Sequence, residues 1–282
     1  MSEFTRFEVV DNIGIVTLCR PPVNAVCQEI KQDMIEIFES VNNGRVDVHC
    51  IIINSDQRGF CGGADTKEWY HPDPVRRANG APLINRMQDA IYRCNVPVIA
   101  AVNGFCFGMG FGIVSICDVV IAEKDAKFAF PEINVGSVGG PLWLTRIMSE
   151  KMARYYLLTG ENIPAEEMYR LGVVFKVVEK EDLMDEAMAI ARKFTAKYPP
   201  ALWAIKTLMN ETEAEVQDLL EITNRMRKLG NRNFMANDPN KKEMTMAFNE
   251  KRKPVFTSDG LKYQQDKIKA YRAEHVHFEL EI

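Results

Sequence analysis

The chain has 282 residues, a length that suits one large domain or a core with a smaller appendage. With 46% hydrophobic and 26% charged residues, the composition is that of an ordinary globular protein. The formal net charge of -4 argues against broad binding to nucleic-acid backbones, although a local basic patch is compatible with it. There is no signal-peptide pattern and no apolar run of membrane-spanning length, so we expect a cytoplasmic protein.

The cysteines and histidines indicate neither a disulfide framework nor a metal site. No C-x-x-C pair occurs among the seven cysteines, and most of them lie in apolar runs, which is typical of reduced thiols buried in a cytosolic protein. His49 and His71 have no partner at ligand spacing, and His275 and His277 lie in the tail. We therefore expect no metal.

Apolar runs of two kinds alternate along the first 200 residues. Short runs rich in β-branched residues predict strands, and apolar residues spaced by three or four predict helices. Strands are predicted at residues 7–9, 14–18, 50–54, 97–102, 119–122 and 173–178. The first two are expected to form a hairpin around Asp11-Asn12. The predicted helices comprise residues 28–41, 83–94, 142–149, 151–159 and 182–197, the last capped by Asp182.

The connections and the C-terminal part have a different character. Prolines make residues 20–25 a rigid extended connection, and the polar residues 71–81 are expected to form a mobile loop. After Pro199 the strand signals stop, and helices are predicted at residues 211–235, 239–248 and 260–274. We therefore divide the chain into a core of residues 1–198 and a helical C-terminal region of residues 199–282.

The most informative stretch is the buried strand at residues 97–102 with the glycines that follow it. Asn103-Gly104 predicts a turn, and glycines at 108, 110 and 112 leave the backbone bare at the start of a helix. The first N–H groups of a helix have no intrahelical partner and suit an oxygen that becomes anionic. The same glycines would also allow a helix to pack tightly on a strand.

A second stretch repeats this layout. Residues 60–65 follow another predicted strand and contain Gly62-Gly63 before Ala64. If the two strands are neighbours in one sheet, an N–H group from each stretch can converge on one oxygen, which is the geometry of an oxyanion hole. The alternative is two tight turns without a ligand.

A carboxylate completes the candidate site. Glu132 follows a strand and Pro131 and lies beside apolar residues, where desolvation would raise its pKa and suit it to proton transfer. From the local sequence alone it could equally be a helix cap or a surface residue. Nucleophilic catalysis has few candidates, because there is no G-x-S-x-G elbow and no histidine between residues 72 and 274.

Five ordered motifs resemble those of the crotonase (enoyl-CoA hydratase/isomerase) family. The family segments F-x-x-G-A-D-x-K-E, N-G-x-x-x-G-G-G, F-x-x-P-E-x-x-x-G, T-G-x-x-x-x-A…G-L-V and A-F-x-E-K-R-K-P-x-F are matched by residues 60–68, 103–110, 128–136, 159–174 and 247–256. The resemblance implies an α/β spiral of repeated ββα units with a C-terminal helical region, assembled as homotrimers that often pair into hexamers. It also implies an acyl-CoA substrate of fatty-acid metabolism and no separate cofactor, because coenzyme A is part of the substrate; no membrane or nucleic-acid partner is expected.

The resemblance assigns roles to individual residues. The N–H groups of Ala64 and Met109 would hold the thioester oxygen, and Glu132 would transfer the proton. The positions that match the substrate and CoA site are Pro22, Asn24, Ala25, Gly62, Ala64, Asp65, Lys67, Met109, Trp143, Phe248 and Lys251, the last two across a subunit boundary. Without the resemblance, Lys67 would be read as a solvated residue and Phe248 as core.

The chain departs from the family pattern at several of these positions. Hydratases with two catalytic glutamates carry the first where this chain has Gly112, so Glu132 is the one acid/base that remains. Met109 replaces the middle glycine of a triplet, Leu142-Trp143 replaces a glycine pair, and Gly140 replaces the aspartate of dienoyl-CoA isomerases. One carboxylate can shuttle a proton between two carbons, as in enoyl-CoA isomerases, and also resembles the arrangement of hydroxycinnamoyl-CoA hydratase-lyases.

Two classes of function therefore follow. The first is an enzyme of the enoyl-CoA hydratase/isomerase type that uses Glu132, with a hydratase-lyase or an acyl-CoA hydrolase as variants. The second is a binding protein that keeps the fold without the chemistry, for which a C-terminal set of basic residues would serve RNA or a protein partner unless it is simply a solvated helix face. That set comprises Arg225, Arg227, Lys228, Arg232, Lys241 and Lys242.

Overall fold

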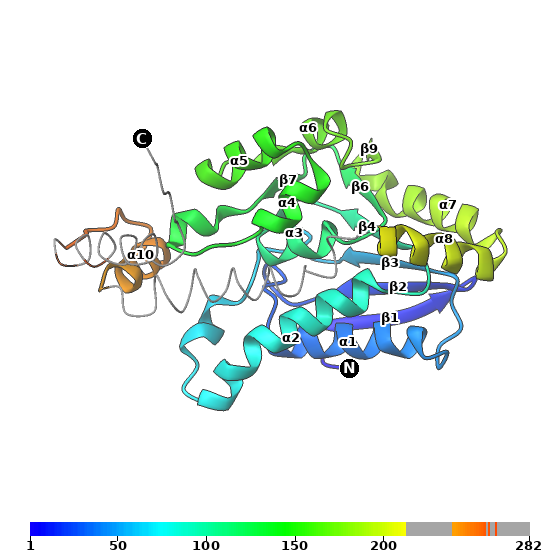
Figure 1. Ribbon diagram of the computed structural model, residues 1–282, viewed down its shortest axis with the longest axis horizontal. Coiled ribbons are helices and arrows are strands. Elements are labelled where there is room, and N and C mark those ends of the chain that lie inside the picture. The colour runs from blue at the N-terminus through cyan, green and yellow to red at the C-terminus, as the bar shows by residue number, and fades with distance from the viewer. Residues whose placement is uncertain (213–238, 258, 260–262, 264–282) are drawn as a thin grey trace, which may run out of the picture. The chain divides into compact units, whose positions relative to one another are not determined.

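The computed structural model describes residues 1–212, 239–257, 259 and 263. The chain forms two compact units. The first contains residues 1–130 and 140–216, and the second contains residues 131–139 and 217–282. Each unit is described by itself below, and Figure 1 labels the elements of both.

The first unit is built on a large, mostly parallel sheet. In the described part of the chain this sheet has six strands in the order β1-β2-β3-β4-β6-β9. They are β1 (Thr5–Val10), β2 (Ile13–Leu18), β3 (Cys50–Ser55), β4 (Val98–Val102), β6 (Val119–Glu123) and β9 (Lys176–Val178). The antiparallel β1–β2 pair is the predicted hairpin, and Asp11 and Asn12 take the positive φ values of 52° and 60° that its tight turn requires.

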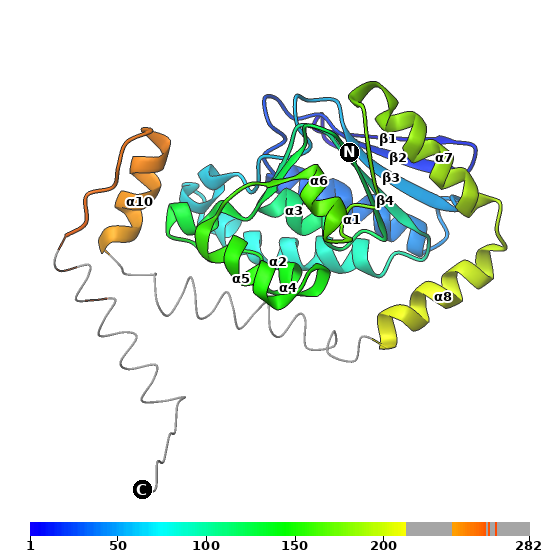
Figure 2. The same ribbon diagram turned by 90° about the horizontal axis from the view of Figure 1, so that it is seen from above.

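The two faces of the sheet bury different residues because side chains alternate along each strand. On β4, Val98, Ala100 and Val102 join one hydrophobic cluster, whereas Ile99 and Ala101 join another. Helices α1 (Gln28–Asn42), α2 (Pro74–Tyr92) and α3 (Met109–Val114) supply the first cluster, and α7 (Leu183–Thr195) supplies the second. In Figures 1 and 2, α1 and α2 lie side by side on one side of the sheet, with α7 on the other.

The remaining elements complete the two units. A small sheet holds β5 (Phe105–Phe107), β7 (Lys127–Ala129) and β8 (Ile163–Pro164) in the order β5-β7-β8. The first unit also contains the 3₁₀ helices η1 (Thr66–Tyr70) and η3 (Lys180–Asp182) and the helices α4 (Pro141–Ile147), α5 (Glu150–Thr159), α6 (Ala165–Arg170) and α8 (Pro199–Thr212). The second unit contains η2 (Pro131–Val135) and α10 (Pro239–Asn249), which touch where Gly136 meets Met244.

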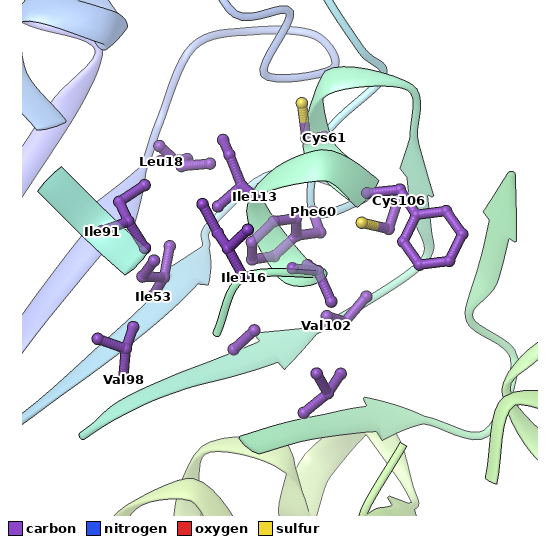
Figure 3. Packing of buried hydrophobic residues seen from close by; sticks show 14 of the residues in the cluster. Leu18, Ile53, Phe60, Cys61, Ile91, Val98, Val102, Cys106, Ile113 and Ile116 are labelled. Carbon is purple, nitrogen blue, oxygen red and sulfur yellow. The ribbon is translucent and has the colours of Figure 1, made fainter. Parts of the chain in front are cut away.

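Helix α3 packs closely on the loop that precedes η1. A Cβ atom at Gly110 would lie 2.5 Å from the Cβ atom of Cys61 and 2.9 Å from its Sγ atom. Figure 3 shows Phe60 and Cys61 next to Ile113 and Ile116, above Val98 and Val102 of β4. The absence of a side chain at Gly110 thus allows the first turn of α3 to reach the loop backbone.

Several predicted elements differ in the structure. The expectation of a mobile loop at residues 71–81 is wrong, because α2 already begins at Pro74. Proline is favoured in the first turn of a helix, and the side chain of Asp73 caps it by accepting a hydrogen bond from the N–H of Val75 at 2.9 Å. These local start signals outweigh the polar composition of the stretch.

Two further predictions need correction. The strand predicted at residues 173–178 is limited to β9, because the N–H groups of Val173 and Val174 both donate to the carbonyl of Met168 and continue the turn after α6. Asp182 does precede α7, but its side chain makes no capping hydrogen bond. The sequence also gave no signal for β5, which lies between the predicted turn and α3.

Part of the C-terminal prediction lies outside the described residues. The helix predicted at residues 211–235 and the helical tail at residues 260–274 fall almost entirely there, together with Arg225, Arg227, Lys228 and Arg232. The helix predicted at residues 239–248 is confirmed as α10. The proposed division at residue 198 stays a prediction. No described helix combines the length and apolarity needed to cross a bilayer.

We predict that Gly110→Ala lowers the free energy of unfolding by about 1–3 kcal/mol, because the added methyl group overlaps Cys61. The measurement is chemical denaturation followed by circular dichroism. Gly80→Ala in α2 is the matched control, since no described atom lies within 4 Å of the new methyl group, and it should be neutral or stabilising by up to about 1 kcal/mol. Equal stability of the two variants would show that the contact between α3 and the loop is not tight.

Candidate active site

The loop before η1 runs alongside β5. The N–H of Cys61 donates to the carbonyl of Phe105 at 3.0 Å, and the N–H of Phe107 donates to the carbonyl of Cys61 at 2.8 Å. These two bonds form an isolated parallel bridge between Cys61 and Cys106. The bridge fixes the start of the loop against the strand that leads into α3.

The same loop pairs on its other side with the segment before α1. The N–H of Val26 donates to Gly63 at 2.8 Å, and the N–H of Asp65 donates to Val26 at 3.1 Å, which makes a parallel bridge between Val26 and Ala64. In such a bridge the residue opposite Val26 directs its own N–H away from the partner. The N–H of Ala64 accordingly takes no part in this bridge, and it donates to no acceptor in the described part of the chain.

Met109 is the first residue of α3, and its N–H therefore has no intrahelical acceptor. The preceding N–H, that of Gly108, donates to the carbonyl of Ala129 at 2.9 Å and anchors the turn to β7. A Cβ atom at Gly63 would lie 3.4 Å from the carbonyl oxygen of Phe107 and 4.0 Å from the Cα atom of Gly108. The structure thus brings the residue before Ala64 next to the residue before Met109.

Asn24 and Arg20 brace the proline-containing connection against this loop. The buried Asn24 amide donates to the Ser55 hydroxyl at 2.7 Å and to the carbonyl of Phe60 at 3.0 Å, and its oxygen accepts from the N–H of Arg20 at 2.7 Å. The Arg20 guanidinium donates to the carbonyl of Ala25 and pairs with the Asp65 carboxylate, both at 2.7 Å. Sequence reasoning treated residues 20–25 as a rigid connection and did not foresee these bonds.

The other predicted CoA-site residues of the first unit lie close by. Gly62 donates its N–H to the carbonyl of Val23 at 2.7 Å, and Pro22 is exposed on the same connection. Asp65 also caps η1 by accepting the N–H of Lys67 at 3.0 Å. The Lys67 side chain is exposed, which leaves its ammonium group available to an anion.

Gly112 lies one turn into α3, between side chains of α2 and α4. A Cβ atom at this position would lie 3.3 Å from Nε2 of Gln88 and 4.0 Å from Cδ1 of Trp143. Trp143 is half-buried and packs on the hydrophobic cluster beneath α3. The predicted substrate residue Trp143 and the position of the missing glutamate are therefore neighbours.

Glu132 belongs to the second unit, in η2. A Cβ atom at Gly139 would overlap its carboxyl group, and its carbonyl accepts the N–H of Ser137 at 2.9 Å. Its Oε2 atom is buried without a hydrogen-bond partner among the described residues. Burial raises the pKa of the Glu132 carboxyl from its ordinary value of 4.5 to about 7, as the sequence analysis expected from desolvation.

Phe130 and Gly140 of the first unit flank the segment of residues 131–139 in the chain. Phe130 stacks on Phe111 of α3 with ring centroids 4.8 Å apart. Gly140, which follows the segment, lies so close to the Phe130 ring that a Cβ atom there would overlap it.

Phe248 and Lys251 lie in the second unit, at and just after the end of α10. Both are exposed, Phe248 to 56%, and the N–H of Lys251 donates to the carbonyl of Phe248 at 3.1 Å. They are thus accessible in the single chain, and their role in a CoA site across a subunit boundary stays a prediction.

Sequence reasoning missed Gln88. This glutamine lies on the apolar stripe of α2 that also carries Met87 and Ile91, both fully buried. A polar residue at a core position of an amphipathic helix is an unusual pattern, and it is the signal that would have singled Gln88 out.

The family comparison agrees with the motifs in the sequence. A protein-family model described as enoyl-CoA hydratase/isomerase matches residues 8–259. Among curated proteins, a (7aS)-7a-methyl-1,5-dioxo-2,3,5,6,7,7a-hexahydro-1H-indene-carboxyl-CoA hydrolase of Rhodococcus jostii (strain RHA1) is 36% identical over 208 residues, which are 71% of this chain and 78% of that protein.

A second relative and a solved structure extend the similarity to most of the chain. A carnitinyl-CoA dehydratase of Escherichia coli (strain SMS-3-5) is 32% identical over 263 residues, which are 91% of this chain and 99% of that protein. The crystal structure of an enoyl-CoA hydratase/isomerase from Pseudoalteromonas atlantica T6c has a TM-score of 0.81 at 25% identity and covers 90% of this chain and 100% of that one. The predicted crotonase-type α/β fold is thereby confirmed.

We predict that the raised pKa of Glu132 makes the fold less stable as the pH rises from 4.5 to about 7. In this window the folded protein keeps the carboxyl proton while the unfolded chain releases it, so the stabilisation present below pH 4.5 is lost by about pH 7. The loss should reach at most about 3 kcal/mol relative to Glu132→Gln, measured by denaturation at a series of pH values. A constant difference between wild type and variant across the window would contradict the pKa.

Proposed function

We propose a reaction through a thioester enolate for this chain, which belongs to the enoyl-CoA hydratase/isomerase family and acts on CoA thioesters. The proposed enzyme is of the hydratase or double-bond isomerase type, with Glu132 as its single acid/base. The observation that carries the proposal is the pair of unused backbone N–H groups at Ala64 and Met109, on two segments that the structure holds side by side.

The two N–H groups would act on the thioester oxygen. A thioester has weak resonance, so its α-carbon loses a proton readily and the negative charge moves onto the carbonyl oxygen. Two preorganised donors stabilise that charge more strongly than the neutral carbonyl, and each is worth roughly 3–4 kcal/mol of the barrier. The bridges at Cys61 and Val26 hold the donors in place before substrate arrives, which supports this role.

Glu132 would move the proton. A carboxyl group with a pKa of about 7 is half ionised near neutral pH, so it can both take a proton from the α-carbon and return one to a neighbouring carbon.

Coenzyme A would bind along the braced connection and the loop before η1. Asn24, Ala25, Gly62 and Asp65 belong to that framework, with Pro22 exposed beside it. The Lys67 ammonium is suited to a CoA phosphate. Following the family resemblance, Phe248 and Lys251 would complete the site of a neighbouring copy in a homotrimer or hexamer, and Trp143 would contact the acyl group.

Hydrolysis of an acyl-CoA is the second candidate function. The observation that favours it is the 36% identity to a CoA hydrolase of Rhodococcus jostii. Incubation with 2-enoyl-, 3-enoyl-, 3-hydroxyacyl- and hydroxycinnamoyl-CoA separates the candidates, because hydrolysis releases free CoA thiol whereas hydration and isomerisation keep the thioester. Release of free CoA thiol from every substrate would favour the hydrolase. If none of the substrates binds or reacts, a non-catalytic protein is favoured.

We expect Glu132→Gln to lower kcat by roughly 10²–10⁴, because the amide keeps the shape of the side chain but cannot exchange a proton. Affinity for CoA should stay unchanged, and the proton-abstracting step of the wild type should speed up as the pH rises through about 7. The control is Glu8→Gln on an exposed strand position. Full turnover by Glu132→Gln would remove this residue from the mechanism.

Met109→Pro tests the second donor, because proline lacks the N–H group yet is tolerated in the first position of a helix. The variant should lose roughly 10²–10³ in kcat while the fold, followed by circular dichroism, persists. Met109→Leu keeps the N–H and should retain most of the activity. If the two variants lose activity equally, the side chain and not the N–H group matters at this position.

A further inference from the structure

The carboxamide of Gln88 is a polar group at the edge of the core that no described protein group binds. Gln88 lies in α2 with an exposed fraction of 6%, and its side chain makes no hydrogen bond in the described part of the chain. Neither polar atom of this amide is among the fully buried, unsatisfied side-chain atoms of the described residues, so both still reach solvent. An amide that is enclosed by the core, bonded to no protein group and open to solvent is a candidate for binding a ligand.

The position of Gln88 relative to α3 indicates where that ligand would lie. Gly112 follows Met109 by three residues, so the two positions share one face of α3 about 4.5 Å apart along its axis. The Cα–Cβ direction of a helical residue tilts toward the N-terminus of the helix, and from Gly112 it points toward Met109. Nε2 of Gln88 lies 3.3 Å from that Cβ position.

We propose that Gln88 binds an oxygen on the third carbon of the acyl group, either a hydroxyl group of the substrate or the water that adds there. The assignment rests on the function proposed above. The separation between Met109 and Gly112 is comparable with that between a thioester oxygen and an oxygen on the third carbon. An acyl chain whose carbonyl oxygen accepts the N–H of Met109 would therefore bring its third carbon toward Gln88.

The chemistry of an amide defines what Gln88 can do there. A carboxamide donates and accepts hydrogen bonds but neither gains nor loses a proton near neutral pH. Gln88 would thus position the oxygen beside the backbone of α3 at Gly112, while Glu132 would carry out the proton transfers. The preferred ligands are 3-hydroxyacyl thioesters, with plain saturated acyl thioesters bound more weakly.

Calorimetric titration tests this preference without relying on turnover. The wild-type protein is titrated with butyryl-CoA and with each enantiomer of 3-hydroxybutyryl-CoA. One enantiomer should bind roughly three- to tenfold more tightly than butyryl-CoA, as expected for one hydrogen bond to a buried amide. Gln88→Met, which keeps the volume and shape of the side chain, should remove the preference and leave butyryl-CoA binding unchanged.

The matched control is Asp89→Asn, a half-buried position on the same helix whose side chain pairs with Arg93, which should keep the preference. Equal binding of both ligands by the wild type would overturn the role of Gln88 while leaving the proposed function intact, and this measurement stands even if Gln88→Met fails to fold. A preference that survives in folded Gln88→Met would also overturn it. If the wild type binds neither thioester, the proposed function itself fails.

Discussion

The close approach of two backbone segments is the constraint on which the rest of the site depends. Cys61 bridges to Cys106 on one side of the loop, Ala64 bridges to Val26 on the other, and the glycine at position 110 lets α3 reach the Cys61 backbone. Each bond fixes backbone and not side-chain atoms, so the geometry does not depend on rotamers. Within the described residues, the N–H of Ala64 stays free because its neighbours form the bridge to Val26, and the N–H of Met109 stays free because Met109 is the first residue of α3.

Polar side chains of two kinds occur in the described part of the two units, those held by hydrogen bonds and those that lack partners. Asn24 and the Arg20–Asp65 pair have satisfied hydrogen bonds and hold the framework. Among the described residues, the Oε2 atom of Glu132 is buried without such a partner, and the largely enclosed side chain of Gln88 makes no hydrogen bond. Polar groups that no protein group binds are candidates for binding a ligand or transferring a proton.

Gly112 stands where two-glutamate hydratases carry a catalytic carboxylate, so the groups around it determine what this part of the chain can do. In place of the carboxylate that two-glutamate hydratases carry there, α3 presents bare backbone between Gln88 and Trp143. An amide and an indole ring can orient an acyl group but cannot exchange protons. In the proposed reaction Glu132 is therefore the acid/base, and its raised pKa of about 7 suits both directions of proton transfer.

The sequence by itself determined the fold class, the hairpin and the central strands, because these follow from apolar periodicity and ordered motifs. The ordered local motifs also identified Ala64, Met109 and Glu132 as candidate site residues. It misjudged residues 74–81, where capping by Asp73 outweighed polar composition, and it overlooked Gln88 and the bracing by Asn24. The Asp73 cap is a local contact, whereas the other two features depend on residues distant in the chain, Gln88 with Gly112 and Asn24 with Phe60. Local propensity cannot encode such pairings, since only the packing of the helices on the sheet brings the partners together.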